Sequence, residues 1–129
     1  MPGRILIADD RFASRLMLTA LFGGAYYDIL QVDHGSRVLQ VARSERPGAV
    51  IISDRIAGDG AVALCSRLRA DPAAGESLRI VITDRADPVR AALLIGAGAD
   101  DVMTRSCRDE EVLARLHSLL DYKSRIAEL

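Results

Sequence analysis

The sequence has few of the features that mark secreted, membrane or disulfide-rich proteins. Only two cysteines, Cys65 and Cys107, occur among the 129 residues, and they form no CxxC pair. Isolated cysteines are typical of a reducing compartment, so we expect a cytoplasmic protein. The first residues do not resemble a signal peptide, and no apolar run is long enough to cross a bilayer.

An excess of charge of one sign is also lacking. Lysine and arginine number 17 and aspartate and glutamate 18, which gives a formal net charge of −1 with both signs interspersed. Such a balance provides no field that would attract nucleic acid or a membrane surface, so we expect neither partner. Half of the residues are hydrophobic, which at this length is enough for one domain with a single core.

What the sequence does contain is a regular alternation of short apolar runs and longer helical patterns. Strands are expected at 4–8, 28–32, 49–53, 79–83 and 101–104, and helices at 11–23, 36–45, 61–70, 88–97 and 108–129. Three of the strands are nearly all apolar, as in strands buried on both faces of a parallel sheet. The alternation predicts an α/β fold of the (βα)5 class, with a doubly wound, five-stranded parallel sheet.

Polar side chains stand at the ends of four of these strands. In such sheets ligands bind beyond the carboxyl ends of the strands. The residues there are Asp9 and Asp10, then Ser53 and Asp54, then Thr83 and Asp84, and finally Arg105. Together they form the candidate site, although Asp9 and Asp10 alone would also suit simple capping of the helix that follows.

These strand ends, with ILIADD (5–10), CSRLRADP (65–72) and GAGADDVMTR (96–105), resemble the receiver domain of two-component response regulators. The likeness extends over nearly the whole chain and implies a flavodoxin- or CheY-like three-layer sandwich. It implies that Asp9 and Asp10 are the acidic pair that holds Mg²⁺ and that Thr83 is the hydroxyl position of the fourth strand. Arg105 occupies the position at which the family has a lysine, and Val102 occupies the position at which the family has an aromatic switch residue.

The resemblance also indicates which residue occupies the phosphoacceptor position. Ungapped counting from Pro47 and from Thr83 places that position on Ser53, not on Asp54. Successive side chains of a strand point to opposite faces, so Asp54 is expected to point away from a site that Ser53 faces.

The substitutions at this site predict a degenerate receiver. The Ser53 hydroxyl cannot form an acyl phosphate and is a poor nucleophile without an adjacent base. Arg105 replaces the compact ammonium group of lysine with a planar guanidinium group, which prefers to pair with carboxylates. Asp84 adds a negative charge where a phosphoryl group would approach. We expect weakened Mg²⁺ binding and no confidently assigned catalytic residue. Our hypothesis is that Arg105 bridges Asp9, Asp10 or Asp84.

Three functions compete. The leading one is a non-enzymatic receiver that controls an output domain without phosphorylation, by docking or by homodimerising through the face formed by 88–97, 101–104 and 108–129. The second is an active, Mg²⁺-dependent receiver that is phosphorylated on Asp54 by a sensor histidine kinase or a phosphotransfer protein. The third is a flavodoxin-like cofactor binder, which is disfavoured because two carboxylates stand where its phosphate loop would be.

The last helical pattern runs past Asp121 without glycine or proline. We therefore expect a receiver domain at 1–121 and, at 122–129, the start of a helical linker to an output domain; the alternative is a frayed final helix. This tail and AYYDIL (25–30) resemble receivers of the PleD type, which precede GGDEF diguanylate cyclase modules. Any cyclase activity would belong to that absent module.

Overall fold

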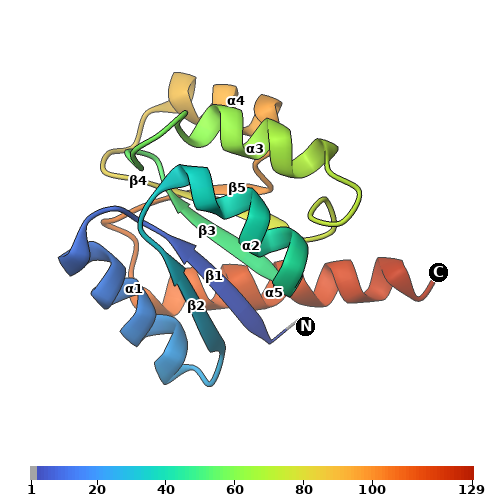
Figure 1. Cartoon of the computed structure of the whole chain (residues 1–129). Helices are drawn as coiled ribbons and strands as arrows, with labels where there is room; N and C mark the ends of the chain where they lie inside the picture. Colours follow the sequence, from blue (N-terminus) through green and yellow to red (C-terminus); the bar gives the residue numbers. More distant parts are fainter. Residues whose placement is uncertain (1–2) are drawn as a thin grey trace.

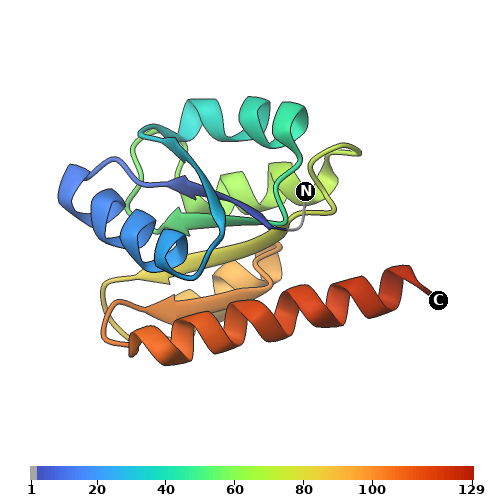
Figure 2. The same ribbon diagram turned by 90° about the horizontal axis from the view of Figure 1, so that it is seen from below.

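The structure, a computed structural model that describes residues 3–129, contains a five-stranded parallel sheet between two layers of helices (Figures 1 and 2). The strands are β1 (Arg4–Ala8), β2 (Asp28–Val32), β3 (Ala49–Ser53), β4 (Leu78–Thr83) and β5 (Asp101–Thr104). Their order is β2-β1-β3-β4-β5, so the chain starts inside the sheet and winds outward in both directions. The predicted doubly wound α/β fold is confirmed.

The helices alternate with the strands as the sequence predicts. They are α1 (Phe12–Gly24), α2 (Val38–Glu45), α3 (Ala61–Ala70), α4 (Pro88–Ala97) and α5 (Asp109–Ala127). The expected helix at 36–45 differs at its start, where a 3-10 turn (η1, Gly35–Arg37) precedes α2. The turn lies close to the loop after β3, because a Cβ at Gly35 would stand 2.9 Å from the Ala57 carbonyl oxygen.

Alternate residues of the central strand pack against different helical layers. Val50 and Ile52 belong to the cluster beneath α2, α3 and α4, whereas Ala49 and Ile51 belong to the cluster beneath α1 and α5. All five residues of β3 are buried. This alternation fixes which way the residues at the end of β3 point.

The strand register brings the carboxyl ends of the strands to one edge of the sheet. Ser53 is paired with Ile82, and Thr83 is paired with Thr104. The backbone N–H of Arg105 donates to the Thr83 carbonyl at 2.9 Å, which continues the ladder one residue past β5. The polar residues after β1, β3, β4 and β5 are therefore neighbours.

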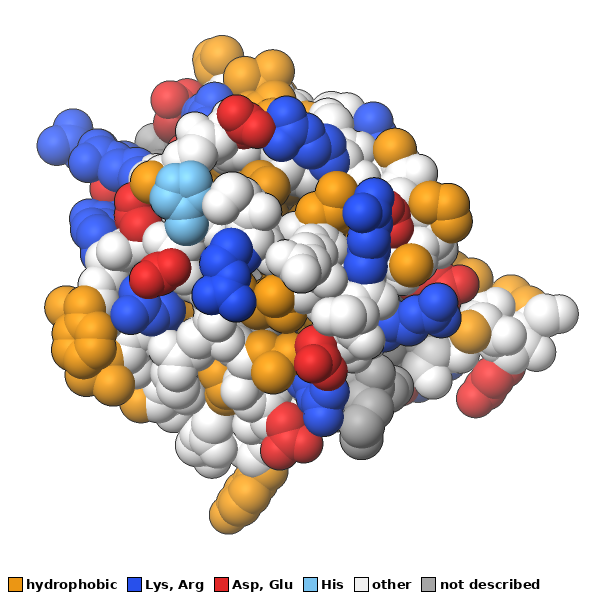
Figure 3. Space-filling view, in the orientation of Figure 1, with side chains coloured by type: hydrophobic (Ala, Val, Ile, Leu, Met, Phe, Trp, Pro, Cys, Tyr) orange, Lys and Arg blue, Asp and Glu red, His pale blue; other side chains and the backbone are white. Residues whose placement is uncertain are grey.

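The surface in the orientation of Figure 1 shows acidic and basic side chains interspersed, without a field of one sign (Figure 3). No helix in the described part of the chain is long and apolar enough to cross a membrane.

Candidate functional site

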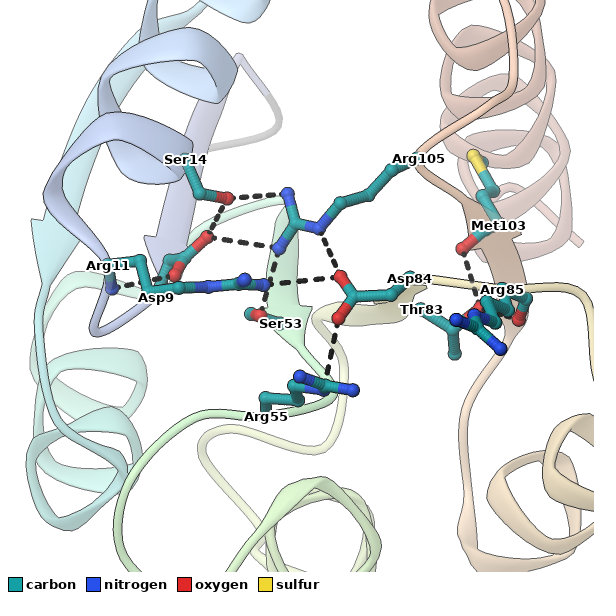
Figure 4. A network of polar contacts seen from close by, with 10 residues as sticks. All are labelled: Asp9, Arg11, Ser14, Ser53, Arg55, Thr83, Asp84, Arg85, Met103 and Arg105. Carbon is teal, nitrogen blue, oxygen red and sulfur yellow. Dashed lines mark hydrogen bonds and ion pairs between the residues drawn. The ribbon is translucent and has the colours of Figure 1, made fainter.

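The candidate site is a hydrogen-bonded network at the carboxyl edge of the sheet (Figure 4). Asp9 follows β1 and is fully buried, and Ser53 ends β3 and is 1 % exposed. Asp84 and Arg105 follow β4 and β5, and about a quarter of each side chain is exposed. Four segments far apart in the sequence therefore meet at one point.

Arg105 is the centre of this network. Its Nε donates to Asp84 at 2.8 Å, and its Nη2 donates to Ser53 Oγ at 3.1 Å and to Asp9 Oδ2 at 3.4 Å. Its Nη1 donates to Ser14 Oγ on α1. A guanidinium carries five N–H donors in a fixed planar fork, so one side chain can link several acceptors. Arg105 thus contacts two of the three carboxylates named in our hypothesis; Asp10 is not among its partners.

The two acidic residues after β1 have different surroundings. Asp9 accepts from the backbone N–H of Arg11 at 2.9 Å through one oxygen, and from Ser14 and Arg105 through the other. Asp10 is exposed and accepts from the backbone N–H of Ala57 at 3.0 Å. Neither aspartate is the N-cap residue of α1, because that residue is Arg11, whose side chain makes no capping hydrogen bond. The capping alternative therefore does not describe this pair.

Asp84 is surrounded by three guanidinium groups. Besides Arg105, Arg55 Nε lies 3.0 Å from one carboxylate oxygen, and Arg11 Nη2 donates to the other at 3.2 Å. The hydrogen bonds from Arg105 and Arg11 hold the pKa of the Asp84 carboxyl below its usual range. The negative charge that Asp84 adds is therefore compensated within the site.

Asp54 points to the other side of the sheet. Its two carboxylate oxygens accept from Arg90 of α4, from Nε at 3.0 Å and from Nη2 at 2.6 Å. This bidentate pair holds the Asp54 side chain toward α4, and neither Asp9 nor Arg105 is among its hydrogen-bond or ion-pair partners. The alternation of side chains along β3 thus separates Ser53 from Asp54 as the strand register predicts.

The remaining candidate residues lie beside the network. The Thr83 hydroxyl donates to the Arg85 carbonyl at 3.0 Å, with the Met103 carbonyl at 3.5 Å, so it is turned away from Ser53. Val102 is partly buried and packs against the cluster beneath α2, α3 and α4.

The donors present do not fit a magnesium ion well. Mg²⁺ takes oxygen ligands in octahedral geometry and usually needs one or two free carboxylates. Both Asp9 oxygens already accept hydrogen bonds, and a cation, Arg105, lies between Asp9 and Ser53. Within residues 3–129, no group of three His, Cys, Asp or Glu side chains is placed to hold a metal.

Three residues of the network were missed by reasoning from sequence: Arg11, Ser14 and Arg55. A signal for the two arginines was present, because Asp-Arg follows three successive strands of the site at 10–11, 54–55 and 84–85. An arginine beside each acidic residue indicates internal charge compensation. Ser14 carried no such signal, because its role depends on how α1 packs.

Comparisons with known proteins agree with this fold. The model of the response regulator receiver domain matches residues 5–117. The DNA-binding response regulator MtrA of Mycolicibacterium smegmatis is 31% identical over 120 residues, covering 93% of this chain and 51% of MtrA. The response regulator PleD of Caulobacter vibrioides is 28% identical over 132 residues, covering 100% of this chain and 28% of PleD. The chain thus spans about half the length of MtrA and less of PleD.

Solved structures show the same architecture. A putative response regulator from Chloroflexus aurantiacus superposes with a TM-score of 0.88 at 26% identity, covering 94% of this chain and 99% of that one. The receiver domain of the sensor histidine kinase PA1611 from Pseudomonas aeruginosa, with a magnesium ion in its active-site cleft, gives 0.84 at 18% identity, covering 92% and 97%. By its family match and its fold, this chain belongs to the response regulator receiver domain family.

Proposed function

We propose that this receiver domain works without an aspartyl phosphate, because Arg105 permanently supplies the positive charge that Mg²⁺ would otherwise bring to the acidic site. The observation that carries the proposal is the position of the Arg105 guanidinium, within 3.4 Å of Asp9, 3.1 Å of Ser53 and 2.8 Å of Asp84. A receiver is a switch in two-component signalling, and here the switch is held in one state by an internal ion pair.

Phosphoryl transfer to Ser53 lacks its chemical requirements. A hydroxyl needs a neighbouring base to become an effective nucleophile. Ser53 Oγ instead accepts a hydrogen bond from Arg105, and a guanidinium cannot take up a proton in a protein. The buried position of Ser53 further restricts access by a phosphodonor.

Signalling would then pass through the surface of the domain. We propose that residues 1–121 form the receiver and that residues 122–129 begin a linker to an output domain in cis. A sensor histidine kinase would then not control this output domain by phosphorylating the receiver. Dimerisation through the face of α4, β5 and α5 is supported by exposed Val89 and Leu93 on α4. The domain itself would be a non-enzymatic cytoplasmic module, and a GGDEF output domain is one candidate that the likeness to PleD suggests.

The flavodoxin-like alternative gains no support from the site. A cofactor phosphate at the end of β1 would meet the carboxylates of Asp9 and Asp10, which would repel it.

The test is incubation with acetyl phosphate or phosphoramidate and Mg²⁺, followed by intact mass spectrometry. We expect no added phosphoryl group on the wild-type chain. A Ser53→Asp/Arg105→Lys double variant, which restores an acceptor and the compact ammonium, is expected to acquire a base-labile adduct. Circular dichroism of the variant shows whether it is folded.

Two outcomes would contradict the proposal. A base-labile adduct on the wild-type chain that disappears in Asp54→Asn would establish the active-receiver alternative. An acid-stable adduct that disappears in Ser53→Ala would establish a phosphoserine.

A further inference from the structure

A cleft opens between α1 and α5, the two helices that cover one face of the sheet (Figures 1 and 2). Its volume is about 630 Å³. Sites for small molecules typically enclose roughly 300–1,000 Å³, so the cleft is large enough for one. It adjoins the Arg105 network at the carboxyl edge of the sheet, because Arg105 and Ser14 both line it.

The body of the cleft is apolar. Its lining includes the buried side chains of Ile82 on β4 and Val112 on α5. Leu18 and Leu21 of α1 are half-buried beside them, and Met17 is exposed at the opening. A methionine side chain has three rotatable bonds and adapts its shape to an apolar partner. An apolar group of a ligand would therefore be removed from water here.

Polar groups converge at the end of the cleft that lies beside the network. Arg11 precedes α1, Ser14 lies in its first turn, and Arg105 follows β5. About half of the Arg11 side chain and a quarter of the Arg105 side chain are exposed. Arg11 donates to Asp84 through Nη2 at 3.2 Å, and a guanidinium has further N–H donors for a second acceptor.

The charges at this end favour an anion with a single charge. The charged residues that line the cleft are Arg11 and Arg105, opposed by Asp109 at the start of α5, so one positive charge is in excess. The nearby carboxylates of Asp9 and Asp84 are already compensated by ion pairs with three guanidinium groups. One carboxylate would balance the excess, whereas a phosphate dianion would exceed it and would be repelled by Asp109.

We propose that this cleft binds a small carboxylic acid with an apolar body. The carboxylate lies between Arg11 and Arg105, since guanidinium groups pair well with carboxylates, and the apolar body lies against Met17 and Val112. The ligand would give an unphosphorylated receiver a chemical input beside its charge network. This role as an input rests on the proposed function, whereas the binding itself does not.

The first test is an NMR titration of the isotope-labelled chain with octanoate, and with octanol as its uncharged match. We expect octanoate to shift the amide resonances of Ser14, Met17 and Val112 in a saturable way. We also expect it to bind about tenfold more tightly than octanol, which cannot form a charged pair with arginine. Equal affinities for the two probes would overturn the proposal, as would the absence of saturable shifts at these amides.

The second test uses variants at exposed residues of α1. Met17→Asp places a carboxylate at the opening of the cleft and is expected to weaken octanoate binding by about tenfold or more. Leu16→Asp, at the neighbouring exposed residue outside the cleft lining, is the matched control and should leave binding unchanged. Arg11→Gln should remove the preference for octanoate over octanol without changing octanol binding. Equal effects of Met17→Asp and Leu16→Asp would contradict the proposed site.

A concentration series without ligand tests a different occupant of the cleft. If the amides of Ser14, Met17 and Val112 shift with protein concentration and Met17→Asp abolishes those shifts, a second copy of the chain occupies the cleft and the proposal is wrong. None of these measurements involves a phosphodonor. Failure of this proposal is therefore distinguishable from failure of the proposed function.

Discussion

The guanidinium of Arg105 and the carboxylate of Asp9 form the least exposed ion pair of the site, with Asp9 at 0% exposure. A buried carboxylate is costly unless charged or hydrogen-bonded partners compensate it. Ser14 and the backbone N–H of Arg11 supply two of these partners, and Arg105 forms an ion pair with the Asp9 carboxylate. At this scale, Arg105 has a structural role as well as its proposed signalling role.

Arg105→Ala is therefore expected to lower the free energy of unfolding by about 2 kcal/mol, since it leaves a buried charge without its counter-ion. Urea denaturation measures this change. The control is Arg85→Ala, at an exposed arginine on the same edge of the sheet, which should change stability by less than about 0.5 kcal/mol. Equal effects of the two variants would show that Arg105 is a surface cation.

The lowered pKa of Asp84 makes the free energy of unfolding depend on pH. Its folded-state pKa is lowered, first by hydrogen bonds from Arg105 and Arg11. A depressed pKa means that the unfolded chain binds more protons, so this contribution is fully present above the unfolded value near 3.9 and is lost as pH falls through the folded value. Asp71 acts in the same direction, through the backbone of Ala74 and the side chain of Arg43.

We accordingly expect stability to be nearly constant between about pH 7 and pH 5 and to fall below about pH 4, where these carboxylates protonate. Asp84→Asn should make that fall shallower, and Asp33→Asn, at an exposed residue, should leave it unchanged. Chemical denaturation across this pH range measures both slopes. An Asp84→Asn slope identical to wild type would contradict the assigned origin of the pKa shift.

At the scale of elements, the Asp54–Arg90 pair joins the loop after β3 to the first turns of α4. The pair is bidentate, and only 17 % of the Asp54 side chain is exposed, so it is better shielded than a typical surface ion pair. α4 also begins with a capping bond from the Arg90 N–H to Asp87 at 3.1 Å. The start of α4 is thus held through both the backbone and the side chain of Arg90.

Arg90→Ala should loosen α4 without reaching the Arg105 network. We expect a loss of about 1 kcal/mol in stability and faster amide hydrogen exchange confined to α4 and the loop after β3. Exchange mass spectrometry measures the effect peptide by peptide, with Arg67→Ala, which breaks the exposed ion pair with Asp59, as the control. Unchanged exchange in α4 would mean that the capping bond and core packing suffice to hold the helix.

At the scale of the whole molecule, a ligand that binds only the folded state raises stability with its concentration. Mg²⁺ at millimolar concentration is expected to leave the thermal unfolding midpoint of the wild-type chain unchanged, since a guanidinium already compensates the acidic site. The Ser53→Asp/Arg105→Lys variant should gain a Mg²⁺-dependent rise. Calorimetric scans with Mg²⁺, and with Ca²⁺ as a control for ion size, measure the unfolding midpoints of the wild-type chain and of the variant. Stabilisation of the wild-type chain by Mg²⁺ would contradict our conclusion that its site does not fit this ion well.

Much of the fold follows from the sequence alone. The apolar runs AVIIS and RIVIT are typical of strands buried on both faces of a parallel sheet, and the helical periods between the runs predict the alternation of strands and helices. Periodicity did not reveal the 3-10 start of the second helical segment, because it depends on the close approach of Gly35 to Ala57 from a distant loop.

The sequence by itself determined which residues stand at the strand ends and, through the two-residue period of a strand, that Ser53 and Asp54 face opposite sides. Only the tertiary structure decided which charges pair there. Asp9, Asp10 and Asp84 were equal candidates for Arg105. The meeting of the ends of β1, β4 and β5 selected Asp9 and Asp84, and the packing of α1 added Ser14. An ion pair between residues 96 positions apart depends on how separate elements pack, and no local pattern in the sequence encodes that distance.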